Sequence, residues 1–171
     1  MVIRMKNAKV LIVMGSDSDY PVVEAAVKIL RDFSVEFEAR VCSAHRSPQL
    51  ASEMATKAEE NGFDVIIAAA GKAAHLPGVL AAYTPLPVIG IPIGSSSVGG
   101  LDSLLSIVQM PAGIPVATVA LDGAENAALL AIQMISLRDP ALREKLVEYK
   151  KSLADKVIEK DKNLQKKLSS T

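Results

Sequence analysis

The sequence has no tryptophan, a single cysteine and only two histidines, and these scarcities exclude several kinds of protein. Its one cysteine, Cys42, cannot form a disulfide within the chain, and no cluster of Cys and His has the spacing of metal ligands. Aromatic residues make up 4% of the chain, so few rings are present to sandwich a flavin, and Ala, Val, Ile and Leu must fill the core. We therefore expect no metal site, and a module that binds a flavin or a nucleotide stays open as an alternative despite this scarcity of rings.

The sequence also lacks an excess of charge of either sign. Lys and Arg together number 19, and so do Asp and Glu, which gives no electrostatic reason to expect binding to nucleic acid or to an anionic membrane. Residues 1–7 include Arg4 and Lys6 and lack the apolar stretch of a signal peptide. We therefore expect a soluble, cytoplasmic protein.

Charged residues are nearly missing from the middle of the chain. Between residues 65 and 121 the only charged side chains are Lys72 and Asp102, while Pro85, Pro87 and several glycines interrupt the segment too often for a membrane span. A monomer of 171 residues has too little interior to bury so long an apolar segment. We expect it to form the core and a subunit interface, since obligate interfaces resemble a core cut in half.

Five short apolar segments, most of them rich in β-branched residues, alternate with helical patterns. This alternation predicts an α/β protein with a doubly wound parallel sheet, in the strand order 2-1-3-4-5. The second segment carries charged residues at alternate positions, which indicates a strand near a sheet edge. One of the predicted helices spans residues 48–61. The predicted strands are residues 8–14, 35–41, 65–70, 87–91 and 116–121.

Residues 140–168 form one long helical pattern with apolar residues at steps of three or four positions. From Arg138 onwards the chain holds ten of the 19 basic side chains against six acidic ones. Such interspersed charges are more typical of the solvated face of a packed helix than of an RNA-binding tail. We expect one domain over residues 1–171, with an α/β core at 8–136 and a C-terminal helix at a subunit interface.

In a doubly wound sheet every strand-to-helix loop opens on the carboxyl edge, where ligands bind. The loops at residues 15–19, 43–47, 71–78 and 92–100 are therefore expected to converge. Together they carry both histidines, an arginine, a lysine and a series of serines. We expect the functional site at this edge.

The first two loops contain groups suited to a phosphorylated ligand. Ser16 and Ser18 offer hydroxyls near a helix start capped by Ser18 or Asp19, where unpaired backbone N–H groups favour an anion. The negative charge of Asp19 repels a phosphate unless the side chain points away from it. In that case Asp19 would instead accept hydrogen bonds from sugar hydroxyls. Arg46 supplies the bidentate donor that a phosphate needs, and the adjacent His45 is the candidate general acid and base.

Three further residues each keep two interpretations. His75 either caps a short helix or belongs to the site, and Lys72 either extends into solvent or binds substrate. Cys42 lies at the end of a strand and is a weak candidate nucleophile, because the chain offers no base for it beyond His45.

Five motifs, taken in order along the chain, carry a resemblance to a known family. They are Val-Met-Gly-Ser-Asp-Ser-Asp, Ser-Ala-His-Arg-Ser-Pro, Ala-Ala-His-Leu-Pro-Gly, Gly-Leu-Asp-Ser-Leu and Ile-Val-Gln-Met-Pro-Ala-Gly-Ile-Pro-Val. Over residues 10–136 the chain closely resembles the class I N5-carboxyaminoimidazole ribonucleotide mutases of purine biosynthesis. The resemblance implies a flavodoxin-like three-layer fold, a homo-octamer whose active sites are completed by neighbouring subunits, and a reaction without metal or organic cofactor.

The implied reaction moves a carboxylate from the exocyclic nitrogen of an aminoimidazole ribonucleotide to its ring carbon. The matching motifs imply that His45 transfers the protons and that Arg46 binds the phosphate. The family commonly has glycine where this chain has Lys72, so a second activity stays open: carboxylation of aminoimidazole ribonucleotide by carbon dioxide itself. If that position needs a positive φ, the lysine strains the loop. The other implied substrate-binding residues are Ser16, Asp19, Ser43, Gly71, Lys72, Ala73 and His75.

Overall fold

The computed structural model describes residues 7–94 and 98–169, and the chain divides into two compact units, Met1–Ile135 and Ser136–Thr171. The second unit consists chiefly of one long helix, α6 (Pro140–Ser169). The strands of the first unit are β1 (Lys9–Met14), β2 (Glu36–Val41), β3 (Val65–Gly71), β4 (Val88–Ile93) and β5 (Ala117–Thr118). Its helices are α1 (Tyr20–Asp32), α2 (Pro48–Lys57), α3 (Leu76–Ala81), α4 (Leu101–Val108) and α5 (Ala124–Ser136), with a 3-10 turn at Asp17–Asp19.

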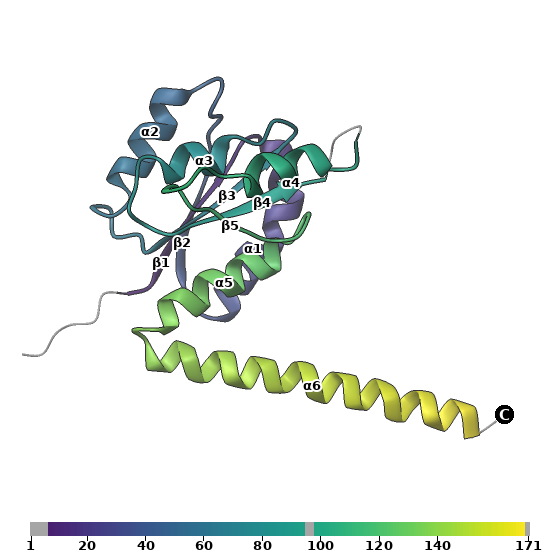
Figure 1. Cartoon of the computed structure of the whole chain (residues 1–171). Helices are drawn as coiled ribbons and strands as arrows, with labels where there is room; N and C mark the ends of the chain where they lie inside the picture. Colours follow the sequence, from purple (N-terminus) through teal and green to yellow (C-terminus); the bar gives the residue numbers. More distant parts are fainter. Residues whose placement is uncertain (1–6, 95–97, 170–171) are drawn as a thin grey trace, which may run out of the picture. The chain divides into compact units, whose positions relative to one another are not determined.

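The strands form one sheet in the order β2-β1-β3-β4-β5, and every neighbouring pair is parallel. Helices α1 and α5 cover one face of this sheet, and α2, α3 and α4 cover the other, which makes three layers (Figure 1). The predicted fold class and the predicted strand order are both confirmed.

The core consists largely of aliphatic side chains that alternate between the two faces of the sheet. On β1, Leu11 and Val13 belong to a buried cluster that includes Ala55 of α2, Leu80 of α3 and Ile107 of α4. Alanine at such a contact lets a helix approach the sheet closely. A core with few aromatic rings can therefore still be densely packed.

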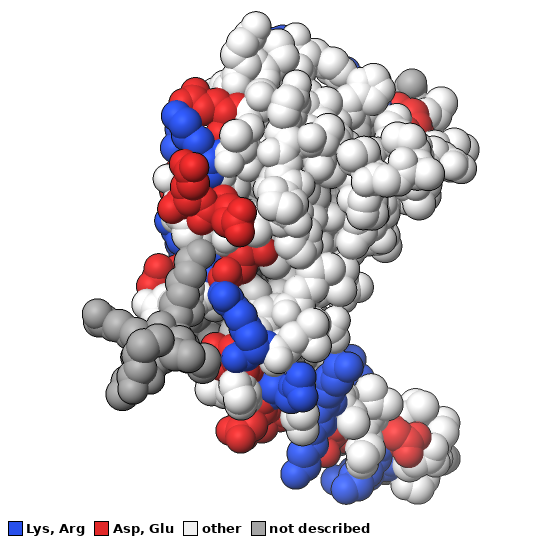
Figure 2. All heavy atoms as spheres, turned by 60° about the vertical axis from the view of Figure 1, so that its left-hand side comes forward, with Lys and Arg blue, Asp and Glu red and all other residues white. Residues whose placement is uncertain are grey.

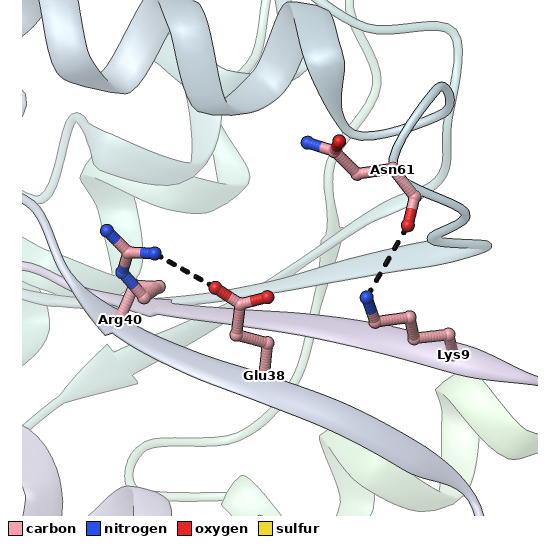
Figure 3. Close-up of polar contacts among 4 residues, drawn as sticks. All are labelled: Lys9, Glu38, Arg40 and Asn61. Carbon is pink, nitrogen blue, oxygen red and sulfur yellow. Dashed lines mark hydrogen bonds and ion pairs between the residues drawn. The ribbon is translucent and has the colours of Figure 1, made fainter.

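Strand β2 is an edge of the sheet, as its alternating charges predicted. Glu38 and Arg40 of β2 form an ion pair of 2.9 Å on the exposed surface (Figure 3). At the start of the neighbouring β1, the Lys9 ammonium donates to the main-chain oxygen of Asn61 at 3.4 Å. Polar contacts that are so exposed to solvent contribute little to stability. Strand pairing and the burial of the inner strands therefore hold this edge in place.

One helix and one strand are each four residues shorter than predicted, while β1 and β2 each begin one residue later than predicted. The helix predicted over residues 48–61 ends at Lys57, and the chain then turns through Gly62 at a φ of +87°. The last strand spans Ala117–Thr118 instead of residues 116–121.

Proline explains why β5 stops early. Thr118 pairs with Gly90 of β4, and the N–H of Val119 still donates to the carbonyl of Gly90 at 3.1 Å. The next β4 residue that faces β5 is Pro92, which accepts a hydrogen bond from the N–H of Asp122 but has no N–H to donate. The regular ladder therefore ends there.

Among the helices that the structure describes, none is long and apolar enough to cross a membrane.

Candidate functional site

The loops that follow β1, β2 and β3 surround one pocket with a volume of about 440 Å³. Every residue predicted from the sequence to belong to the site lines this pocket. These residues are Ser16, Asp19, Ser43, His45, Arg46, Gly71, Lys72, Ala73 and His75. The three predicted loops therefore meet, which follows from the central position of β1 between β2 and β3.

The fourth predicted loop, at residues 92–100, is different. Its residues 95–97 lie outside the described part of the chain, and none of its described residues lines the pocket. Strand β3 separates β4 from β1, so the loop after β4 begins farther from the centre of the site. Sequence reasoning also left out the apolar lining by Ala44, Ala70 and Leu76, which carry no chemical signature of their own.

The first loop is held by hydrogen bonds that Ser16 makes with Asp19 and with Ser18. The Ser16 N–H donates to the Asp19 carboxylate at 3.1 Å, and the Ser16 hydroxyl oxygen accepts from the Ser18 N–H at 3.3 Å. Helix α1 begins just after Asp19, as predicted, but the Asp19 side chain points back along the chain and does not cap α1. This geometry orders the loop before any ligand binds.

Burial perturbs the Asp19 carboxyl. Its side chain is 7% exposed, and the loss of solvation raises its pKa above the ordinary value. The negative charge of Asp17 raises the pKa further, while the hydrogen bonds from Ser16 and Ser18 act in the opposite direction. A carboxylate kept in this position at neutral pH therefore costs stability, which is typical of a side chain retained for binding.

The second loop places Arg46 across two strand ends. The hydroxyl of Ser43 accepts from the Arg46 main-chain N–H at 3.2 Å and from its Nε at 3.4 Å. An Arg46 terminal nitrogen also donates to the carbonyl of Gly15 at 3.5 Å. These contacts hold the guanidinium beside the first loop, whose Ser16 and Ser18 line the same pocket. The arrangement offers a cation and several donors to one anion.

His45 and His75 come from different loops and touch directly. The Nε2 of His45 lies 2.7 Å from the Nδ1 of His75, and the two rings meet edge to face. One nitrogen must donate and the other accept, so the contact fixes the tautomer of each ring relative to the other. His75 occupies the N-cap position of α3, but its side chain makes no capping bond there and contacts His45 instead.

The third loop contains an unfavourable backbone conformation at Lys72, whose φ is +57°. This left-handed region costs a residue with a Cβ about 1–2 kcal/mol, whereas glycine adopts it freely. The sequence predicted backbone strain at Lys72 if this position needs a positive φ. The structure shows that positive φ, so the strain is present. Cys42, by contrast, is 2% exposed with its sulfur near Ser47, so it is not available as a nucleophile.

The fold and the pocket together define the class of protein. It is an α/β protein of flavodoxin-like architecture with a small-molecule site at the carboxyl edge of the sheet. Within the described residues, no three His, Cys, Asp or Glu side chains gather as metal ligands. The chain belongs to the AIR carboxylase family, whose model matches residues 9–156.

The chain is similar to relatives along almost its whole length. It is 58% identical to the N5-carboxyaminoimidazole ribonucleotide mutase of Pyrococcus horikoshii, over 96% of this chain and 94% of the relative. It is 50% identical to the mutase of the same name from Thermotoga maritima, over 92% of each chain. The crystal structure of Treponema denticola PurE matches with a TM-score of 0.83 at 32% identity, over 92% of this chain and 99% of that one.

Replacing Lys72 with glycine should stabilise the protein. Lys72→Gly removes the left-handed strain, which outweighs the added flexibility of the unfolded chain, and should raise the free energy of unfolding by about 1 kcal/mol. Ser34, at a φ of +60° after α1 and away from the pocket, provides the matched control, and Ser34→Gly should give a similar gain. Urea denaturation followed by circular dichroism measures both. A loss of stability in Lys72→Gly would mean that its side chain holds the loop.

Neutralising Asp19 should stabilise the protein in a pH-dependent way. Because the folded state raises the pKa of Asp19, the charged carboxylate lowers stability at pH values above that pKa and ceases to do so as the pH falls through it. Asp19→Asn should therefore be more stable than the wild type at pH 7, with a gain that shrinks towards pH 4. Denaturation across this pH range measures the difference, with the exposed α1 variant Glu24→Gln as the control for one lost charge. A gain independent of pH would contradict the assignment.

Proposed function

We propose that this chain is an N5-carboxyaminoimidazole ribonucleotide mutase. It converts N5-carboxyaminoimidazole ribonucleotide into 4-carboxy-5-aminoimidazole ribonucleotide, a step of purine biosynthesis. The observation that carries this proposal is the 50–58% identity to enzymes of that name over about nine-tenths of the chain. These relatives favour the mutase reaction over direct carboxylation of aminoimidazole ribonucleotide. The pocket supports it independently, since it combines an arginine, a histidine pair and a small apolar lining.

In this proposal the first two loops bind the ribonucleotide. Arg46 holds the phosphate together with the hydroxyls of Ser16 and Ser43; the Ser43 hydroxyl contacts the Arg46 Nε, and Ser16 lines the same pocket. Asp19 accepts hydrogen bonds from the ribose hydroxyls. Its burial and raised pKa support a binding role, because the cost of desolvating the carboxylate exceeds what its hydrogen bonds to Ser16 and Ser18 return.

His45 transfers the protons at the other end of the substrate. It protonates the exocyclic nitrogen of the carbamate, the carbon–nitrogen bond breaks with its electron pair on nitrogen, and carbon dioxide is released. The ring carbon then attacks carbon dioxide to form the new carbon–carbon bond. His45, now unprotonated, removes the proton from that ring carbon and returns to its starting state. The contact with His75 at 2.7 Å supports this role by orienting the ring.

The third loop holds the carboxylate and the carbon dioxide between these steps. Gly71, Lys72, Ala73 and His75 line this part of the pocket, and Ala70 and Leu76 add apolar surface beside them. A small apolar enclosure keeps carbon dioxide next to the ring carbon and keeps water away from it. The reaction needs no further reactant, because the carboxylate that leaves the nitrogen is the one that the carbon receives.

The purified chain should convert the carbamate to the carboxylated product, and His45→Asn should lower turnover by a factor on the order of 10²–10⁴. The asparagine keeps a polar group of similar size but cannot carry the proton. Turnover is measured from the ultraviolet absorbance of the product. Circular dichroism serves as the control for the fold, and nucleotide binding serves as the control for the site. A variant with turnover near the wild type would remove His45 from the chemistry. Faster turnover of aminoimidazole ribonucleotide with bicarbonate than of the carbamate would overturn the mutase assignment.

We also propose that the protein is a cytoplasmic homo-octamer. Its support is the large apolar surface of a single chain: Tyr83, Leu101, Leu105 and Val108 are 47–55% exposed. On the face seen in Figure 2, charged side chains of the α/β unit gather along one margin and leave a broad uncharged expanse. Considered by itself, α6 adds further exposed apolar side chains. Examples are Val147, Val157 and Leu168, at 63–65% exposure.

Light scattering of the full-length chain tests the assembly. We expect a species near eight times the 18.1 kDa of one chain, because neighbouring copies cover the apolar side chains of α4 and α6. Leu105→Lys should shift the protein towards smaller species and lower its activity in parallel. Glu24→Lys adds the same residue type on the exposed side of α1 and should leave assembly intact. A fully active monomer at micromolar concentration would rule the proposal out.

A further inference from the structure

Lys72 is a cation kept in the pocket in a backbone conformation that lysine disfavours. Its φ of +57° would suit glycine better, and its side chain is exposed in the wall of the cavity. Among the described residues, no carboxylate lies within ion-pair distance of its ammonium group. No ion pair within the described residues therefore offsets the strain, which is the pattern of a side chain retained for a ligand.

The pocket carries two permanent cations on different loops. Arg46 lies by the first loop, where its guanidinium contacts the hydroxyl of Ser43 and the carbonyl of Gly15. Lys72 belongs to the third loop, three residues before His75, whose ring contacts His45 at 2.7 Å. One cation thus contacts the first two loops, and the other comes from the loop that supplies His75, the partner of His45.

The substrate and the product of the proposed reaction each carry two anionic groups, a phosphate and a carboxylate. We propose that the Lys72 ammonium pairs with the carboxylate that is transferred, and that it selects carboxylated ribonucleotides over the amine that lacks this group. The inference rests on the proposed function, because it takes the two anions from that reaction. It assigns a specificity-determining residue to a position whose side chain the mechanism above does not use.

This pairing has a kinetic consequence. The ammonium attracts the carbamate of the substrate and the carboxylate of the product, but carbon dioxide between the two steps carries no charge. Lys72 therefore stabilises the bound ground states more than the species between them, so removal of its charge should raise KM and should not lower kcat. Removal of a residue that acted on the chemical step itself would lower kcat.

Calorimetric titration with two nucleotides tests the inference on the full-length chain. The ligands are aminoimidazole ribonucleotide and its 4-carboxylated form, which share the phosphate and differ in the carboxylate. Lys72→Met keeps the length of the side chain and the same left-handed strain, so it removes only the charge. It should weaken binding of the carboxylated nucleotide about tenfold, on the scale of one charged hydrogen bond, and change binding of the amine less than about twofold.

The conservative variant Lys72→Arg keeps the charge and should retain most of the preference for the carboxylated nucleotide. In turnover assays, Lys72→Met should raise KM for the carbamate about tenfold without lowering kcat. If binding of both nucleotides weakened equally, Lys72 would bind the phosphate or maintain the structure of the loop. If neither affinity changed, the Lys72 side chain would only extend into solvent. Either result, or a fall in kcat at unchanged affinity, overturns the inference. A wild-type chain that binds both nucleotides but does not convert the carbamate would instead overturn the proposed function.

Discussion

The pocket depends on the parallel register that ends β1, β2 and β3 at the same level of the sheet. Met14 at the end of β1 pairs with Val41 on one side and with Ala69 on the other. Two main-chain hydrogen bonds carry this alignment into the loops, from Cys42 to the carbonyl of Met14 at 2.9 Å and from Gly15 to that of Ala69 at 3.0 Å. Because each loop leaves the sheet at a fixed height, side chains thirty positions apart in the sequence meet above β1. A slip of one residue would turn each strand's side chains to the opposite face.

Local preferences and the fold agree over most of the α/β unit, although left-handed φ values occur at Ser34 and Asp122 outside the pocket as well as at Lys72 within it. The inner strands β1, β3 and β4 are buried and apolar, and no buried side-chain polar atom of the described residues lacks a hydrogen-bond partner. At the pocket, Asp19 is a carboxylate held out of water, and Lys72 occupies a conformation suited to glycine. Both features lower stability, and both supply a charge to the same cavity. Conflicts of this kind are expected where function, and not folding, has selected the residue.

The two charges in the otherwise uncharged middle of the chain have separate places in the structure. Lys72 lines the pocket, and Asp102 lies in the first turn of α4, where its carboxylate accepts from the N–H of Ser103 at 2.9 Å. A negative charge at that end of a helix is stabilised by the helix dipole. The remainder of this segment supplies core strands and the exposed apolar side of α4, so one run of sequence provides both the interior and the surface on which the proposal of assembly rests.

The sequence by itself determined the architecture and which loop residues line the pocket. Hydrophobic periodicity marked the strands, the alternating charges of residues 36–40 marked an edge, and the alternation of strands and helices favoured the strand order 2-1-3-4-5. These features depend on local patterns and on rules common to all parallel sheets of this kind, so the sequence is enough to predict them. The loop containing His45 and Arg46 was assigned to the carboxyl edge for the same reason.

Only the tertiary structure decided how those residues meet. The contact between His45 and His75, the turn of Asp19 back towards Ser16 and the left-handed φ of Lys72 are not properties of any one segment. Each results from the path of a loop between fixed strand ends, and that path depends on which neighbouring loops it must pass. Local sequence patterns indicate which side of the sheet a residue lies on, but the distance between two side chains is set by the register of three strands at once.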